Sequence, residues 1–144
     1  YEQMGDDKSA RSWWKKAAEG HQEPSAALYY NDAKPDKIFY QGMALLKLGR
    51  KEEANSKFYK LVNYGKEHLF DKVTIDYFAV SLPDFLIWDE SLQDKNEVHC
   101  KYLLALGYYG LGDKCHCRRY LEEARRKDIN HQGILAFMNF VKME

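Results

Sequence analysis

Apolar residues recur at helical spacing along most of this 144-residue chain. Between residues 8 and 18, Ala10, Trp13, Trp14 and Ala17 fall at positions i, i+3, i+4 and i+7 and so share one face of a helix. Comparable stripes predict helices over residues 36–48, 51–68, 94–110, 114–127 and 131–143. Residues 73–80 are rich in β-branched and aromatic side chains, but a single strand would have no partner, so we expect an ordered loop or a short helix there. The pattern predicts an all-α protein.

A short pattern of glycine and apolar residues occurs three times, beginning at Gly5, Gly49 and Gly112. Each Gly is followed by a small residue five positions later, a bulky residue nine positions later and an apolar residue twelve positions later. Such self-similarity is typical of helical hairpins stacked side by side, with the glycine in the turn between two helices. The residues at these positions are Ala10, Trp14 and Ala17; Ala54, Phe58 and Leu61; and Cys117, Leu121 and Ala124.

The small residues predict where the helices approach one another closely, because two helices reach a separation of about 8–10 Å only where small side chains meet. We expect Gly42 to face Ala54 in one hairpin and Ala105 to face Cys117 in the next. Phe58, and its equivalents Trp14 and Leu121, would fill the larger gap toward the following helix. Among the residues that can cap a helix start, we expect this role for Asp94, Asp113 and Asn130.

The repeated pattern resembles the tetratricopeptide repeat (TPR) family. The resemblance covers two near-complete repeats at residues 35–70 and 95–129, preceded by a partial repeat at residues 1–20. It implies a single domain built as a short solenoid of antiparallel hairpins, closed by a capping helix at residues 131–143. The two complete copies are separated by roughly 29 residues more than the standard repeat of about 34. The segment 71–94 is therefore expected to be a non-repeat insertion that packs on the body.

Two further runs, residues 34–42 and 75–84, resemble the C-terminal TPR tail of certain large bacterial proteins. In those proteins a β-sandwich region of unknown function, similar to sugar mutarotases, precedes the repeats. The resemblance implies a bacterial, carbohydrate-related context and no catalytic residue in this part of the chain.

The register also predicts that the chain is a fragment of a longer protein. Tyr1 lies four positions before Gly5, and the matching residues of the other copies, Leu45 and Tyr108, lie inside first helices. We expect the chain to begin partway along such a helix. The apolar edge left at this end would allow self-association, because a repeat contacts only its neighbours.

Composition excludes several classes of partner. The chain has 22 basic and 22 acidic residues, so no net charge would attract nucleic acid or an anionic membrane. No apolar run reaches the roughly 18 residues of a membrane span. The three cysteines are an odd number, which argues against a disulfide framework and favours a reducing, cytoplasmic compartment.

The TPR resemblance implies a groove for a protein or peptide, lined by the first helix of each repeat. The clamp of Lys, Asn and Arg residues that chaperone-binding members use for a terminal carboxylate is absent. Two occupants of the apolar groove are open: a foreign partner, or the chain's own insertion through Tyr77, Phe78, Phe85 and Trp88. The predicted groove residues are Phe39, Met43, Leu46 and Lys47 in one repeat and His99, Tyr102, Leu106 and Tyr109 in the other.

The residues that could carry chemistry do not combine into a predicted site. Cys115 and Cys117, with His99 and Cys100 nearby, invite a zinc hypothesis, but residues two apart on a helix lie roughly 200° apart around its axis. The basic residues of 118–127 alternate with acids, as on a solvated helix face. We therefore expect no metal, no cofactor and no enzymatic activity. A glycosidase needs two carboxylates at a set separation, and nothing in the sequence fixes such a separation. The acids that could suggest such a pair are Asp76, Asp84, Asp89 and Glu90.

Two functions follow from these expectations. The first is a non-catalytic protein-interaction or scaffold module, which docks a partner protein or another domain of its parent chain. The second is an accessory domain of a carbohydrate-active enzyme, which contacts a ligand without performing chemistry. Trp13 is the candidate sugar contact for the second function, because Trp14 occupies the bulky position of its repeat.

Overall fold

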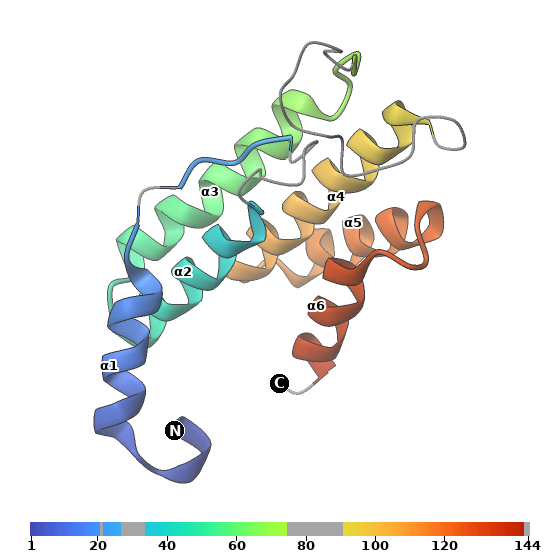
Figure 1. Cartoon of the computed structure of the whole chain (residues 1–144). Helices are drawn as coiled ribbons and strands as arrows, with labels where there is room; N and C mark the ends of the chain where they lie inside the picture. The colour runs from blue at the N-terminus through green and yellow to red at the C-terminus, as the bar shows by residue number, and fades with distance from the viewer. Residues whose placement is uncertain (21, 27–33, 75–90, 143–144) are drawn as a thin grey trace, which may run out of the picture.

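The computed structural model describes residues 1–20, 22–26, 34–74 and 91–142, and every regular element in these ranges is a helix (Figure 1). The predicted all-α fold is confirmed. Most of the predicted insertion, including Tyr77, Phe78, Phe85 and Trp88, lies outside the described residues. The elements are a 3-10 helix η1 (Glu2–Met4) and the α-helices α1 (Asp7–Ala18), α2 (Asp36–Lys47), α3 (Lys51–His68), α4 (Leu92–Gly110), α5 (Lys114–Lys127) and α6 (Gln132–Lys142).

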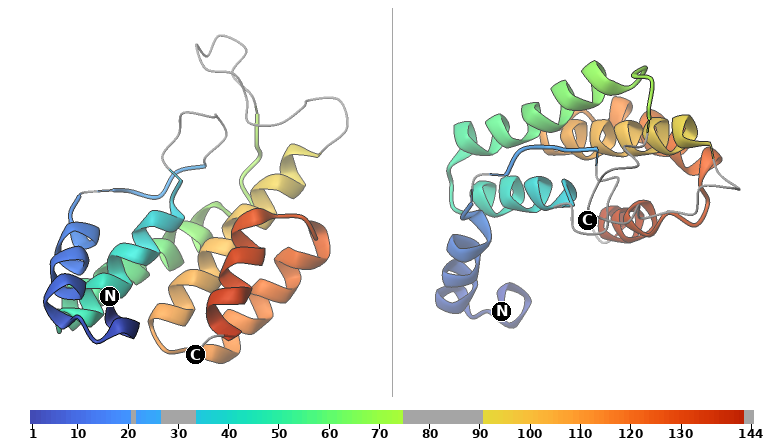
Figure 2. Two further views of the ribbon diagram at one scale, coloured as in Figure 1. Left: turned by 60° about the horizontal axis from the view of Figure 1, so that its bottom comes forward. Right: turned by 45° about the horizontal axis from the view of Figure 1, so that its top comes forward.

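The helices from α1 to α5 pack in chain order, each against the next, and α2 also touches α4. This is the arrangement expected of stacked hairpins. The two views of Figure 2 place α4 between α3 on one side and α6 on the other. The last helix therefore lies across the stack from α3.

The three glycine turns share one backbone geometry, which explains the repeated sequence pattern. Gly5, Gly49 and Gly112 all have positive φ angles, of 74°, 79° and 84°. In each turn the N–H group of the residue after the glycine donates to a carbonyl five residues earlier, as in a Schellman motif. The donor and acceptor pairs are Asp6 and Tyr1 at 3.0 Å, Arg50 and Leu45 at 2.9 Å, and Asp113 and Tyr108 at 2.9 Å.

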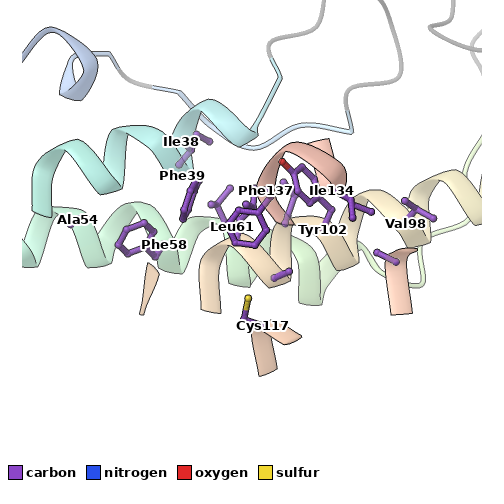
Figure 3. Packing of buried hydrophobic residues seen from close by; sticks show 14 of the residues in the cluster. Ile38, Phe39, Ala54, Phe58, Leu61, Val98, Tyr102, Cys117, Ile134 and Phe137 are labelled. Carbon is purple, nitrogen blue, oxygen red and sulfur yellow. The ribbon is translucent and has the colours of Figure 1, made fainter. Parts of the chain in front are cut away.

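Phe58 connects three helices at the centre of the stack. It is fully buried on α3, and its ring lies against Gly42 of α2 and Gly110 of α4 (Figure 3 shows its place in the core). A Cβ atom added to Gly42 would lie 2.4 Å from the ring, and one added to Gly110 would lie 2.2 Å from it. The three atoms nearest to this position of Gly42 belong to Phe58, and the contact expected between Gly42 and Ala54 stays a prediction. The expected role of Phe58 in reaching the following helix is borne out.

Two other glycines allow α3 and α4 to approach closely. A Cβ atom on Gly65 of α3 would lie 2.7 Å from Leu104, and one on Gly107 of α4 would lie 2.6 Å from Val62. Each glycine therefore leaves space that a side chain of the opposite helix fills. Ala105 and Cys117, the pair predicted for the second hairpin, are both buried.

Three details of the predicted helices are corrected. Helix α4 begins at Leu92, and the N-cap is Ser91, whose hydroxyl accepts the N–H of Asp94. Helix α6 is capped by the ring of His131 rather than by Asn130. Ala17, on the predicted apolar face of α1, is exposed. Among the described helices, α1 packs closely only against α2, so one side of it stays open. The cap at Asp113 is confirmed, since its carboxylate accepts the N–H of His116 at 3.0 Å.

Candidate partner-binding face

The predicted groove residues lie on two neighbouring helices, α2 and α4, and we call the surface they form the α2/α4 face. On α2 the spacing of Phe39, Met43 and Leu46 is i, i+4 and i+7, which places them on one side of the helix. On α4, Tyr102, Leu106 and Tyr109 have the same spacing. The α2/α4 face is therefore apolar along two parallel stripes.

The structure buries or partly buries seven of the eight predicted residues of this face. Phe39, Tyr102 and Leu106 are buried, whereas Met43, Leu46, His99 and Tyr109 are partly buried, and Lys47 is exposed. A buried side chain is out of reach of a second molecule in this conformation. The question for function is which part of the chain covers the face.

Helix α6 covers it with the rings of Phe137, which Figure 3 shows, and of Phe140. The ring centroid of Phe137 lies 5.4 Å from that of Phe39 and 5.4 Å from that of Tyr109, both in edge-to-face geometry. Phe140 lies 6.0 Å from Phe39 and 6.1 Å from Tyr109. These separations are in the range where aromatic pairs attract one another beyond the burial of their area. The described occupant of the α2/α4 face is therefore the last helix.

Helix α6 does not repeat the packing of the earlier first helices. Helix α4 packs extensively against α3, whereas α6 touches α5 only slightly. Instead, the side chains of α6 reach across to α2 and α4, with Ile134 and Phe137 almost completely buried. The sequence predicts a buried stripe of Ile134, Phe137, Met138 and Val141 on this helix, and the structure buries the first two fully and the last two partly. Phe140, which the prediction missed, lies three positions after Phe137 and could have been found by the same helical spacing.

His131 holds the first turn of α6 in place. Its Nδ1 atom accepts the N–H of Ile134 at 3.2 Å, which fixes the tautomer with the proton on Nε2. The ring lies 5.1 Å from the ring of Tyr102 on α4. Burial lowers the pKa of His131, because the charged form would lose its hydration. A neutral histidine thus links the start of α6 to the α2/α4 face.

A cavity of about 540 Å³ lies beside this link. His99 stands in its wall and donates from Nε2 to the carbonyl of Ser25 at 2.8 Å, so the connection before α2 is tied to α4. Burial lowers the pKa of His99 to about 4, which keeps the ring neutral at physiological pH. The wall is built from three parts of the chain: Ala26 with residues 34–36, the first half of α4 at residues 95–103, and residues 128–133 before and within α6.

The other end of the face is polar and adjoins the first residues of the chain. The ammonium group of Lys47 lies 2.5 Å from a carboxylate oxygen of Glu2 and 5.9 Å from the ring of Trp14. Trp13 points outward, is 54% exposed and has the ammonium group of Lys16 over its ring at 4.6 Å. Lys47 is therefore engaged with the N-terminal segment rather than with α6.

The three cysteines do not form a common site. Cys100 and Cys117 are buried, and Cys115 is exposed. Burial raises the pKa of the Cys100 thiol to about 12 and that of the Cys117 thiol to about 11, which disfavours the thiolate needed to bind a metal. Within the described ranges, no three His, Cys, Asp or Glu side chains converge on a point where they could hold a metal ion.

No protein-family model matches the chain, and no solved structure matches it. None of the helices in the described part of the chain is both long enough and apolar enough to cross a membrane. The resemblance to a repeat family therefore rests on the threefold sequence pattern.

Proposed function

We propose that the chain is a non-catalytic protein-interaction module of the TPR type. Its ligand is a protein segment, supplied by a partner or by another domain of the parent chain. The observation that carries this proposal is that the α2/α4 face already receives a helix, α6, through the rings of Phe137 and Phe140. A surface that holds one amphipathic helix has the shape and apolarity to hold another.

The packing of the stack favours a scaffold. Phe58 lies against glycines of both α2 and α4, so the helices that form the face are joined through one buried ring. Helix α5 is joined to α4 by ion pairs, with Lys101 of α4 2.8 Å from Glu123 and Lys127 of α5 2.7 Å from Glu97. A rigid support of this kind lowers the entropy lost when a partner binds. Three free thiols, two of them buried, suit a protein of a reducing compartment such as the cytoplasm.

A second candidate function is the accessory domain of a carbohydrate-active bacterial enzyme. The observation that favours it is the exposure of Trp13, since an exposed indole ring offers a flat apolar surface on which a sugar can lie. This function would use the outer surface of α1 and not the α2/α4 face.

Selection of peptides and of glycans on the same protein separates the two functions. The interaction module should select peptides from a displayed library, and Leu46→Lys, which puts a charge on the partly buried α2/α4 face, should weaken their binding. Tyr59→Lys, on the exposed side of α3, is the matched control and should leave binding unchanged. Binding of glycans that is lost in Trp13→Ala, with no peptide selected, would refute the interaction module and support the accessory domain.

A further inference from the structure

We propose that α6 is the chain's own competitor for the α2/α4 face, and that the external ligand is an amphipathic helix with two aromatic residues three positions apart. This ligand binds by displacing α6. The inference rests on the proposed function. It adds the chemical pattern of the partner and the displacement of α6 that allows the partner to bind.

The contacts of α6 define the pattern that a ligand must carry. Phe137 is fully buried and meets the edges or faces of Phe39 and Tyr109. Phe140, one turn later, packs on the same two rings and lies 6.5 Å from the ring of Tyr40. Ile134, one turn earlier, is 1% exposed. The ligand pattern is therefore an apolar residue, an aromatic residue and a second aromatic residue at successive intervals of three.

The start of the ligand helix needs a small residue. A Cβ atom added to Gly133 would lie 2.9 Å from the hydroxyl oxygen and 2.9 Å from Cζ of Tyr102. Tyr102 is buried, so its ring has little freedom to move away. The position before the first apolar residue of the pattern should therefore be glycine.

Helix α6 is attached by contacts that another helix could reproduce. Residues 132–141 carry no charged side chain, so none of them can form an ion pair with the body of the stack. This differs from the α4–α5 contact, where Lys127 bridges Asp94 at 2.5 Å and Glu97 at 2.7 Å. The hold on α6 comes from burial of its apolar side chains and from the cap at His131. Burial is non-directional, and a second helix with the same apolar pattern obtains the same free energy.

The link between α5 and α6 makes α6 an effective competitor. Helix α5 ends at Lys127 and α6 begins at Gln132, so the tether is short. A segment on a short tether acts at an effective concentration on the order of millimolar, which a free ligand must overcome. Weakening α6 should therefore strengthen binding of an external helix without any change in the α2/α4 face.

The test uses a fluorescent peptide with the sequence of residues 130–142 and the full chain. The double variant Phe137→Ala/Phe140→Ala of the chain should bind this peptide at least about tenfold more tightly than the unaltered chain, because its own α6 no longer competes. The control variant Asn139→Ala, on the exposed side of α6, should bind like the unaltered chain. A peptide in which both phenylalanines are replaced by alanine should not bind either protein.

Hydrogen exchange on the unaltered chain gives a second readout that does not need the double variant to fold normally. Saturating peptide should increase exchange of the amides of α6 and leave the amides of α3 unchanged. Equal affinity of the peptide for the unaltered chain and the double variant, with unchanged exchange in α6, would overturn the inference. Library peptides that bind through the face while α6 stays protected would also overturn it, but would leave the proposed function standing. Absence of any bound peptide would overturn both.

Discussion

The ring of Phe137 on α6 stands nearly perpendicular to the ring of Phe39 on α2, at an interplanar angle of 85° and with the ring centroids 5.4 Å apart. The two residues are far apart in the sequence, and both are fully buried. Their contact places the last helix over the surface formed by the first helices of two hairpins. The α2/α4 face, which the sequence predicts to be a groove, is therefore covered by a helix of the same chain.

Replacing Phe58 of α3 or Phe137 of α6 by alanine should lower the free energy of global unfolding by different amounts. Phe58→Ala removes the ring that joins α2, α3 and α4, and should lower the free energy of global unfolding by about 3–5 kcal/mol. Phe137→Ala should lower it by less, because α6 can leave the face while α1 to α5 stay folded, so the loss is limited to the free energy of docking α6. Urea unfolding of both variants measures the difference. Equal losses would mean that α6 belongs to the same cooperative unit as the stack.

Gly110→Ala tests the close approach of Phe58 to α4. Alanine in place of glycine stabilises the interior of a helix by about 1 kcal/mol, and the gain is smaller at Gly110, which is the last residue of α4. Here the added Cβ atom would lie 2.2 Å from the Phe58 ring, and overpacking of this kind costs about 1–3 kcal/mol. We expect a net loss of stability in thermal unfolding.

A double variant, Gly110→Ala with Phe58→Leu, completes this test. The leucine is smaller than the Phe58 ring that the added Cβ atom would meet. The combined loss should be smaller than the sum of the two single losses, because the smaller side chain makes room for the added methyl group. Simple additivity would contradict the proposed contact.

The parts of the fold that follow from neighbouring residues could be predicted, and those set by distant residues could not. The turns at Gly49 and Gly112 and the cap at Asp113 depend on a few adjacent positions. The start of α4 is harder to predict, because Ser91 and Asp94 can both cap a helix. Ser91 takes the role while the carboxylate of Asp94 pairs with Lys127 on α5, a contact that no local pattern reveals.

The candidate site shows the same division. The spacing of Phe39, Tyr102 and Tyr109 correctly identified residues that share a face, because helical periodicity is local. The partner of that face could not be read from periodicity, since the stripe of α6 fits any apolar surface of the right width. The prediction that Tyr77 and Phe85 help to cover the face lies outside the described residues and stays a prediction.

Docking of α6 should depend on pH through His131. Burial lowers the pKa of His131 in the docked helix below the ordinary value of 6.5, although Asp128 and Asp36 oppose this shift and Lys95 adds to it. The released helix therefore binds the proton more readily, and protonation also removes the Nδ1 acceptor of the Ile134 N–H group. Docking should be strongest above about pH 6.5 and should weaken as the pH falls through and below that value.

His131→Asn separates this effect from the titration of His99, whose pKa is lowered to about 4. An asparagine side chain can cap the helix and does not titrate in this range. Hydrogen exchange of the α6 amides at pH 7.5 and pH 5.5, corrected for the intrinsic rate, measures docking. Loss of protection at the lower pH should be smaller in the variant, and an equal loss in both proteins would rule out His131 as the cause.

The three thiols should react at very different rates. Cys115 is exposed, whereas burial raises the pKa of both Cys100 and Cys117 and shields them from reagent. A thiol-specific chromogenic disulfide should modify one cysteine rapidly in the native protein and all three after denaturation. The variant Cys115→Ser should abolish the rapid phase. A rapid phase that persists in this variant would contradict the burial of Cys117 at the packing position of its repeat.

The most direct test of the central claim is native-state hydrogen exchange along the unaltered chain. If α6 is a separable occupant of the α2/α4 face, the amides of residues 135–141 should exchange by a local opening that leaves α3 and α4 protected. Their free energy of opening should be at least about 1.4 kcal/mol lower than that of the α4 amides, which corresponds to a tenfold difference in the opening equilibrium. Equal opening free energies in α6 and α4, with the same dependence on denaturant, would show that the helix leaves only when the whole stack unfolds.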